Sequence, residues 1–323
     1  MMEEILMGEG GGSGSDGGTT PYRDDDKPIY PNLSDDTTPR GKAFTWLADE
    51  DERRLCPRGG GGGDDNDMSQ SSSFSRSLTQ RYALAVLYHS TSGDDWDSCS
   101  NAPSGGCGDD GGGGNDGFPP GSEPYLSPSS ECKWAGVTCR RDDDGSDDDD
   151  DSTYEENLED GGNDGGSGTI TEIRLEHNGL NGTIPREILG LKGLEILALG
   201  GNALVGTLPR GTIADPTNLR RLTLNDNGLS GNINALSGLP NLVELEVQNN
   251  RLTGTIPPEL GGAYAALRVG RFHGNGFTGT VPGDLCDNIA PLGILAVLTT
   301  DCGGRSPSIQ CDCCTTCFDG LYM

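Results

Sequence analysis

Between residues 170 and 285 the aliphatic side chains recur at fixed offsets, with polar residues between them. Within each of the first four recurrences, aliphatic residues occupy positions 1, 4, 6 and 11, and positions 3–7 alternate in the manner of a short half-buried strand. In all five, asparagine stands at position 9 and glycine at position 13, and proline usually stands at position 16. The copies begin at Ile170, Leu194, Leu219, Leu242 and Leu267. The pattern predicts five structural repeats over residues 169–285, each contributing one strand.

One repeat of this size cannot bury its own aliphatic side chains, whereas stacked repeats share a continuous core. A period of about 20–29 residues with this content is the signature of a leucine-rich repeat solenoid. The sequence therefore predicts an α/β solenoid, a right-handed superhelix whose successive strands form a parallel concave sheet. The position-9 asparagines are expected to form a ladder that satisfies main-chain groups inside the core. They are Asn178, Asn202, Asn227, Asn250 and Asn275.

The ending Leu-x-Gly-x-Ile-Pro, as in 252–257, resembles the plant-type leucine-rich repeats of receptor-kinase ectodomains and polygalacturonase-inhibiting proteins. The resemblance extends over residues 75–323 and implies capped ends and a role in recognition. Two residues depart from the pattern: Asn234 replaces the proline and Gly270 replaces the second leucine. We expect the third repeat to be locally irregular and the fifth to be less well packed.

The string Cys132-x-Trp-x-Gly-Val-x-Cys139 resembles the N-terminal cap of the same family, which implies a disulfide between the two cysteines. We place this cap at residues 76–139, with an apolar helix at 77–90 and a Gly/Asp-rich insertion at 100–131. Cys99 and Cys107 are candidates to close that insertion.

Residues 286–323 resemble a disulfide-braced C-terminal cap. Its cysteines are Cys286, Cys302, Cys311, Cys313, Cys314 and Cys317. Six cysteines allow 15 connectivities, so their pairing stays open. Zinc held by the tail thiolates is an alternative, although two separated C-x-x-C knuckles are missing. The total of 11 cysteines is odd, and Cys56 is the first candidate to remain unpaired.

The net charge of −29 lies mostly outside the repeats. Residues 169–323 hold 10 Lys and Arg and 14 Asp and Glu, so −25 of the total precedes residue 169. This composition predicts disorder in residues 1–75, apart from a short helix at 43–55, and in the acidic insertion at 140–168. A calcium loop fails there because Arg140 falls on the first ligand position, which leaves only weak diffuse cation binding. Nucleic acid is a poor partner for such an acidic chain.

No catalytic triad, metalloprotease helix or phosphate loop is present in the sequence. We therefore expect a non-enzymatic protein without a cofactor or metal. No apolar run approaches the ~18–20 residues of a membrane span, and residues 1–18 contain no apolar leader. The cysteines and the repeat class nevertheless favour an extracellular or cell-surface location. Asn181 and Asn32 stand in glycan-acceptor triplets.

In this fold, outward side chains at positions 3, 5, 7 and 8 line the concave sheet, and we predict that this face binds protein, peptide or glycan. The candidate residues are Glu172, Arg174, Glu176, His177, Ile196, Ala198, Arg221, Thr223, Asn225, Glu244, Glu246, Gln248, Arg271 and His273. Five strands span only about 20–25 Å. Stacking places Arg221 beside Glu244 and Glu246 beside Arg271, where the charges either meet a ligand or satisfy one another. A shallow depression for a ligand side chain is expected at Ile196, Ala198, Gly200, Gly201 and Ala203.

Two alternatives stay open. An acidic extracellular-matrix or cell-wall structural protein would use the repeats as a tether for its Gly/Asp-rich segments. An intracellular scaffold would keep its cysteines reduced.

Overall fold

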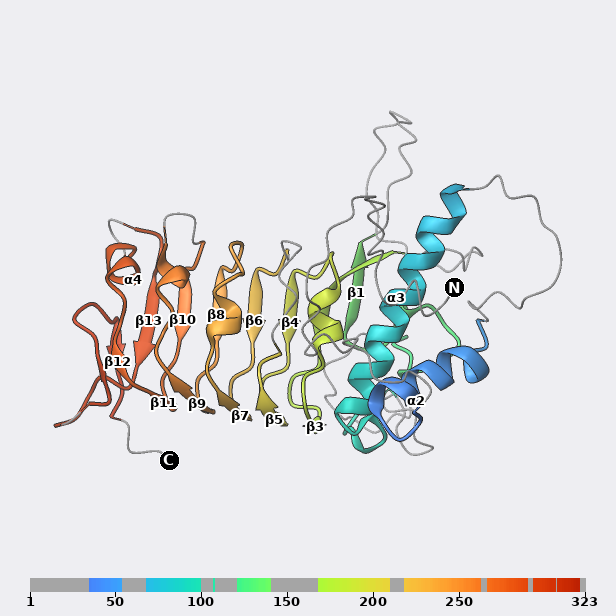
Figure 1. The fold of residues 1–323 in the computed structure, drawn as a ribbon, viewed down its shortest axis with the longest axis horizontal. Coiled ribbons are helices and arrows are strands. Elements are labelled where there is room, and N and C mark those ends of the chain that lie inside the picture. The colour runs from blue at the N-terminus through green and yellow to red at the C-terminus, as the bar shows by residue number, and fades with distance from the viewer. Residues whose placement is uncertain are drawn as a thin grey trace, which may run out of the picture.

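The computed structural model describes residues 35–53, 68–99, 107, 121–140, 168–209, 218–262, 266–289, 293–305 and 307–319. They form an elongated solenoid with helices at one end and a cysteine-rich cap at the other (Figure 1). The predictions for residues 1–34, for the acidic insertion beyond Arg140 and for Cys56 and Asn32 lie outside the described residues. No helix of the described ranges is long and apolar enough to cross a membrane.

The main sheet runs along the whole array. Within the described residues its strand order is β1-β2-β4-β6-β8-β10-β13-β15. These strands are β1 (Val137–Arg140), β2 (Thr169–Arg174), β4 (Ile196–Ala198), β6 (Arg221–Thr223), β8 (Glu244–Glu246), β10 (Val269–Arg271), β13 (Val297–Thr300) and β15 (Thr316–Cys317). β1 pairs antiparallel with β2, and every later neighbour is parallel. The predicted parallel sheet is confirmed, and the two caps lengthen it by three strands.

The inward residues of these strands form the core. The position-6 side chains of the first four repeats, Leu175, Leu199, Leu224 and Val247, are each at most 1% exposed. Their amides donate in regular succession to the next strand, as from Leu199 to the Thr223 carbonyl at 2.9 Å. The aliphatic side chains therefore interlock across consecutive coils, as the periodicity predicts.

In each repeat, the strand that follows the turn belongs to a second sheet. Its order is β11-β9-β7-β5-β3, formed by β3 (Asn181–Gly182), β5 (Ala203–Thr207), β7 (Gly228–Gly231), β9 (Arg251–Gly254) and β11 (Gly276–Phe277). The position-13 glycine has a positive φ in all five repeats, for example 84° at Gly206. Residues that carry a side chain rarely adopt this conformation, which explains why glycine stands at this position. Short 3-10 helices at Arg186–Gly190, Asn234–Leu236 and Pro258–Gly261 return the chain toward the main sheet.

The two departures from the repeat pattern have different outcomes. In the third repeat the 3-10 helix begins at Asn234 itself, whereas in the first and fourth repeats it begins one residue after the proline, at Arg186 and Pro258, so the predicted irregularity is confirmed. The predicted looseness of the fifth repeat is wrong. A Cβ on Gly270 would stand 2.8 Å from the ring of Phe272, because that fully buried ring fills the space of the missing leucine.

The asparagine ladder forms as predicted. Asn227 shows the pattern: its Nδ2 donates to the carbonyls of Leu199 (3.0 Å) and Leu224 (3.2 Å), and its Oδ1 accepts from the amide of Leu204 (2.9 Å). Corresponding bonds are made by Asn202, Asn250 and Asn275. Asn178 instead bonds to the N-terminal cap, with its Oδ1 accepting from the amide of Ser98 at 2.8 Å. Each asparagine thus links one turn to the turn before it.

The N-terminal cap is larger than the sequence indicates. The helix predicted at 43–55 is α2 (Pro39–Thr45), continued by a π-helical turn (Trp46–Glu50), so it begins and ends earlier. The helix predicted at 77–90 is α3 (Met68–Ser90), which begins nine residues earlier. α2 packs on α3, and Trp46 and Leu47 are buried in the common core. Residues 35–53 therefore lie within the cap, which the sequence placed at 76–139.

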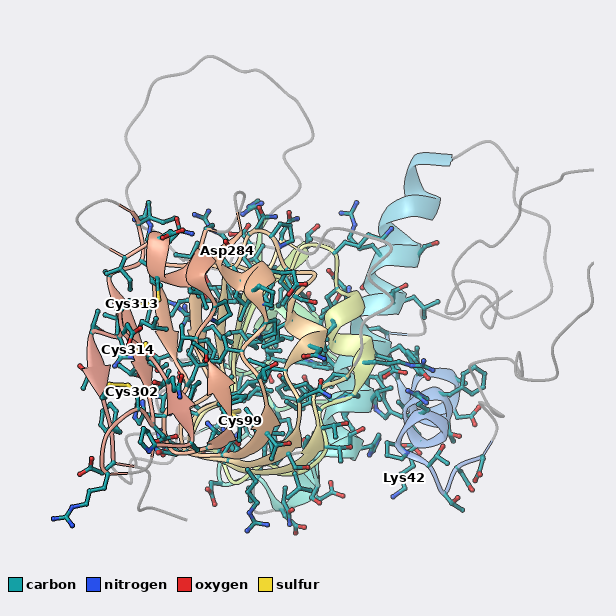
Figure 2. The ribbon with its side chains drawn as sticks, turned by 60° about the vertical axis from the view of Figure 1, so that its left-hand side comes forward. Lys42, Cys99, Asp284, Cys302, Cys313 and Cys314 are labelled. Carbon is teal, nitrogen blue, oxygen red and sulfur yellow. A yellow bond between two sulfur atoms is a disulfide. The ribbon has the colours of Figure 1, made fainter. Side chains whose placement is uncertain are left out.

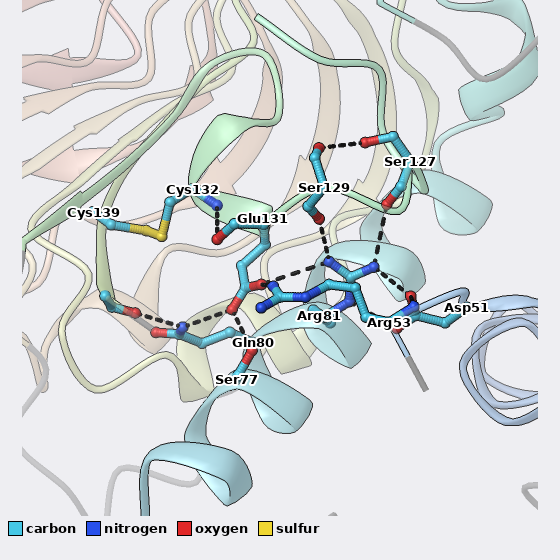
Figure 3. A network of polar contacts seen from close by, with 12 residues as sticks. Asp51, Arg53, Ser77, Gln80, Arg81, Ser127, Ser129, Glu131, Cys132 and Cys139 are labelled. Atoms are coloured by element: carbon cyan, nitrogen blue, oxygen red, sulfur yellow. Dashed lines mark hydrogen bonds and ion pairs between the residues drawn. A yellow bond between two sulfur atoms is a disulfide. The ribbon is translucent and has the colours of Figure 1, made fainter. Parts of the chain in front are cut away.

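A buried arginine joins the parts of this cap (Figure 3). Arg81 of α3 is fully buried, and its guanidinium binds both carboxylate oxygens of Asp51 at 2.7 and 2.8 Å. It also donates to the carbonyls of Ser127 and Ser129 at 3.2 and 2.8 Å. Its guanidinium carbon Cζ lies 5.2 Å and 4.8 Å from the ring centroids of Trp46 and Trp134. The cation thus connects three segments that are far apart in sequence.

Glu131 extends this network to the first repeat. Its carboxylate accepts from Arg53 (3.1 Å), from the Ser77 hydroxyl (2.8 Å) and from Gln80 (3.3 Å). Gln80 in turn accepts from the amide of Ile170 at 2.8 Å, where the array begins. The predicted disulfide between Cys132 and Cys139 is present beside Glu131, with the two Cα atoms 5.5 Å apart.

The C-terminal cap begins with α4 (Gly283–Asp287). It is held by the disulfides Cys286–Cys313, Cys302–Cys317 and Cys311–Cys314. Figure 2 labels Cys302, Cys313 and Cys314 in this cap, at the end of the array. Strand β12 (Gly279–Thr280) pairs with β14 (Ile309–Gln310) beneath it. Strand β13, which begins at Val297, also lies in this cap.

Ten cysteines are used by five disulfides, the fifth being Cys99–Cys107, which the sequence suggests. The Sγ atoms of Cys302, Cys311 and Cys314 lie within 4.8 Å of one another. All three sulfurs are engaged in disulfides, and zinc binding requires thiolates. The cluster thus braces the cap.

Candidate binding surface

The concave face is built from outward side chains in exact strand register. Arg221 of β6 is paired with Glu244 of β8, and Thr223 with Glu246, along the same two strands. Glu246 is likewise paired with Arg271 of β10. Equivalent positions therefore form continuous rows across the sheet, as the repeat pattern predicts.

Opposite charges at repeat positions 3 and 5 form ion pairs between neighbouring strands. Arg221 Nε lies 2.5 Å from a carboxylate oxygen of Glu244, and Arg271 Nε lies 3.0 Å from one of Glu246. The two arginine side chains are 44% and 39% exposed, so these pairs lie at the surface and each stabilises the fold by only about 0–1 kcal/mol. Arg174 pairs within its own strand with Glu172 at 2.8 Å, a contact that the sequence did not predict. Each of these three arginines is therefore neutralised by a glutamate of the same face.

The remaining charges of the face are acidic. Glu176 and Asp226 are exposed, and neither forms an ion pair with any described residue. Asp226 accepts hydrogen bonds from the side-chain amides of Asn225 (2.7 Å) and Asn249 (2.8 Å). Because the arginines are already paired, the face presents net negative charge to a ligand.

The depression expected at residues 196–201 is filled. A Cβ on Gly201 would stand 2.1 Å from the imidazole of His177, and one on Gly200 would stand 2.6 Å from Asn225 Oδ1. Side chains of the neighbouring repeats thus lie over both glycines. Ala198 is 1% exposed and Thr223 is 7% exposed, so neither offers a contact surface. Ile196, which is half-buried, is the remaining apolar residue of that site.

The backbone at position 8 of the repeat is left-handed, a constraint that the sequence analysis did not predict. His177, Asp226 and Asn249 have φ values of 52°, 54° and 58°, in the left-handed region. Gly201 and Gly274 occupy the same position with φ 69° and 68°. Asparagine, aspartate and glycine tolerate this conformation best, so a turn signal was present in the sequence.

The C-terminal end of the face carries an aromatic residue outside the predicted set. Phe318 follows β15 and is 38% exposed. Its ring stacks on the imidazole of His273, with centroids 3.9 Å apart and planes at 10°. The His273 Nδ1 and the Thr299 hydroxyl share a hydrogen bond of 2.8 Å. Burial lowers the pKa of His273, and Arg271 adds to this effect, whereas Asp301, Asp226 and Glu246 oppose it.

Asp301 closes the C-terminal end of the asparagine ladder. Its buried carboxylate turns inward and accepts from the amides of Gly274 (2.9 Å) and Asn275 (3.2 Å). This ends the asparagine ladder, because an aspartate oxygen replaces the amide oxygen of a further repeat.

The glycan-acceptor residue Asn181 is exposed at the first strand of the second sheet. Its side chain is thus accessible, while its main-chain amide donates to the carbonyl of Thr91 in the cap at 3.0 Å.

The comparisons with known proteins agree with the repeat architecture. A family model described as Leucine Rich Repeat matches residues 241–263, within the fourth repeat. The array consists of plant-type leucine-rich repeats. A leucine-rich repeat receptor-like protein kinase of Arabidopsis thaliana is 38% identical over 96 residues, which are 30% of this chain and 9% of the relative. The receptor protein kinase WSS1 of Oryza sativa subsp. japonica is 35% identical over 78 residues, 24% of this chain and 6% of the relative. The chain thus spans less than a tenth of the length of these curated relatives.

Solved leucine-rich repeat structures are also similar in part. The BIR3–SERK2 complex from Arabidopsis thaliana matches with 25% identity over 57% of this chain and 84% of that chain, at a TM-score of 0.40. The BIR2 ectodomain from Arabidopsis thaliana matches with 26% identity over 48% of this chain and 69% of that chain, at a TM-score of 0.37.

Proposed function

We propose that this protein is a non-enzymatic recognition module that binds a peptide or protein segment across the concave face of its leucine-rich repeats. The observation that carries the proposal is the sheet itself. Its inward side is fixed by the aliphatic core and the asparagine ladder, while its outward side presents different side chains from row to row.

The size of the sheet suits an extended segment. Eight strands leave seven spacings of ~4.8 Å, or roughly 34 Å. An extended chain covers at most ~3.3–3.6 Å per residue. About ten residues can therefore lie across the face, compared with the shorter reach expected from five strands alone.

The charge distribution favours a basic ligand. Arg174, Arg221 and Arg271 are neutralised by glutamates, whereas Glu176 and Asp226 remain uncompensated among the described residues. Complementary charge raises association rates and suppresses wrong partners.

The test begins with peptides selected from a random display library on the oxidised protein. The affinity of a selected peptide is measured for the parent and for Glu176→Lys with Gln248→Lys, which change the charge of two separate places on the face. We expect at least tenfold weaker binding. The matched control is Glu259→Lys with Thr255→Lys, which makes the same total change of charge at two exposed residues outside the concave sheet. Equal affinity of the face variant and the control for all selected peptides would reject the concave face as the binding surface.

A further inference from the structure

We propose that Phe318 and His273 form a subsite for a cationic side chain, arginine or lysine, of the bound peptide. This inference rests on the proposed function and assigns a ligand chemistry to one end of the concave face. Phe318 presents its ring to solvent at 38% exposure, while the imidazole of His273 covers one side of it at 3.9 Å.

The ring is held in place by main-chain contacts. The amide of Phe318 donates to the carbonyl of Thr300 at 2.9 Å, and the carbonyl of Phe318 accepts from the amide of Gly303 at 2.9 Å. The preceding residue, Cys317, is bonded to Cys302. A ring that is already ordered loses little side-chain entropy when a ligand binds, which favours a preformed site.

The imidazole is fixed as well. The hydrogen bond between His273 Nδ1 and the Thr299 hydroxyl, at 2.8 Å, sets the orientation of the ring. Because burial lowers the pKa of His273, the imidazole is neutral at pH 7 and does not repel a cation. The two rings therefore act together as a neutral aromatic platform.

The surrounding charges select the ligand. The groups that act electrostatically on His273 are Asp301, Arg271, Asp226 and Glu246. Arg271 is paired with Glu246 at 3.0 Å, and the buried carboxylate of Asp301 is bonded to two main-chain amides. Asp226 is therefore the exposed carboxylate that is left without a cationic partner among the described residues. A cation placed over an aromatic face is attracted by the ring quadrupole, and nearby negative charge adds to that attraction. A neutral sugar ring would stack on the same platform but would gain nothing from that carboxylate.

The test uses defined probes and aromatic NMR signals of the oxidised full chain. Acetyl-Gly-Gly-Arg-Gly-Gly-amide is titrated while the ring resonances of Phe318 and His273 are followed. The isosteric citrulline peptide and methyl β-glucoside serve as neutral probes. We expect saturable shifts with the arginine peptide and about fivefold weaker binding of the citrulline peptide, which corresponds to ~1 kcal/mol.

Two variants of Phe318 separate aromatic from apolar contact. Phe318→Leu keeps the apolar bulk and should weaken the arginine peptide by a similar factor, whereas Phe318→Tyr should retain its affinity. Equal binding of the arginine and citrulline peptides, tighter binding of the glucoside, or unchanged affinity of Phe318→Leu would each overturn the subsite.

Failure of the subsite is distinguishable from failure of the proposed function. A library peptide that is weakened by Glu176→Lys with Gln248→Lys but not by Phe318→Leu rejects only the subsite. A probe that shifts Phe318 while no selected peptide responds to the concave-face variant rejects only the proposed function.

Discussion

Removing the buried arginine of the N-terminal cap should be far more costly than removing an arginine of the concave face. Arg81→Met takes away a guanidinium that makes two bonds to Asp51, one to each of two carbonyls and an ion pair of 3.6 Å with Glu131. Glu131 keeps bonds from Arg53, Ser77 and Gln80. Asp51, whose side chain is fully buried, keeps only the amide of Arg53 at 3.1 Å. The variant therefore leaves one buried carboxylate almost uncompensated.

The expected magnitude follows from that uncompensated charge. Breaking a buried ion pair by removing one partner costs about 3–5 kcal/mol, whereas an exposed pair contributes about 0–1 kcal/mol. We expect Arg81→Met to lower the free energy of unfolding by about 3–5 kcal/mol. The matched control, Arg221→Met, removes the 44%-exposed partner of Glu244 and should stay below about 1 kcal/mol.

A double variant checks the cause. Replacing both partners, Arg81→Met with Asp51→Leu, removes the orphaned carboxylate and should be less destabilising than Arg81→Met alone. The assay is guanidinium unfolding of the oxidised protein, followed by the fluorescence of the tryptophans, two of which flank Arg81. If Arg81→Met and Arg221→Met cost the same, or if the double variant loses the sum of its single variants, the network does not act as a compensated buried charge.

Three further predictions concern the repeats and the cap. Asn227→Ala should lower the free energy of unfolding by about 1–3 kcal/mol, because it leaves buried main-chain groups unbonded; Asn225→Ala, on the exposed side, should change it by less than about 0.5 kcal/mol in the same urea titration. Gly270→Ala should destabilise the protein by about 1–3 kcal/mol, because its Cβ would meet the Phe272 ring at 2.8 Å; an unchanged melting temperature would contradict the packing described. Burial, with repulsion from Lys42, lowers the pKa of His89 below its ordinary 6.5. The unfolded chain then binds the proton more readily than the folded chain does. The contribution of neutral, buried His89 to the free energy of unfolding is therefore complete above about pH 6.5 and is lost as pH falls toward the folded pKa. His89→Gln should remove that part of the pH dependence between pH 7.5 and 5.

Features that depend on the repeat alone could be predicted from the sequence. Each asparagine of the ladder bonds to groups of its own turn and the turn before it, and the periodicity places those turns side by side. The same reasoning gives the contact between Arg221 and Glu244. The register of a parallel sheet is set once the aliphatic rows are aligned.

Features that depend on distant segments could not be predicted. Asp51 and Arg81 are separated by 30 residues, and the pattern around Asp51 contains nothing that marks a buried carboxylate. The contact between Phe318 and His273 joins the C-terminal cap to the fifth repeat, and no local pattern reveals it. The depression at residues 196–201 was predicted from small residue size, but their small size admits the side chains of His177 and Asn225.

One missed boundary did have a local signal. Thr38 caps α2 by accepting from the amide of Gly41 at 3.0 Å, and Pro39 occupies the first helical turn. A threonine followed by proline is a helix-start signal. The early start of α3, in contrast, lies in a serine-rich segment, and serine has low helix propensity.

The local hydrogen bonding of each ladder asparagine has a consequence for how the number of repeats in such a protein can change. Because the side chain of Asn227 bonds only to its own turn and the preceding one, a duplicate of residues 219–241 inserted after the original would meet residues equivalent to those that the original meets. Both end structures would stay as they are, and the reach of the face would grow by one strand spacing of ~4.8 Å. Duplication of single units is therefore a route by which a lineage, or a designer, can match this scaffold to longer or shorter targets.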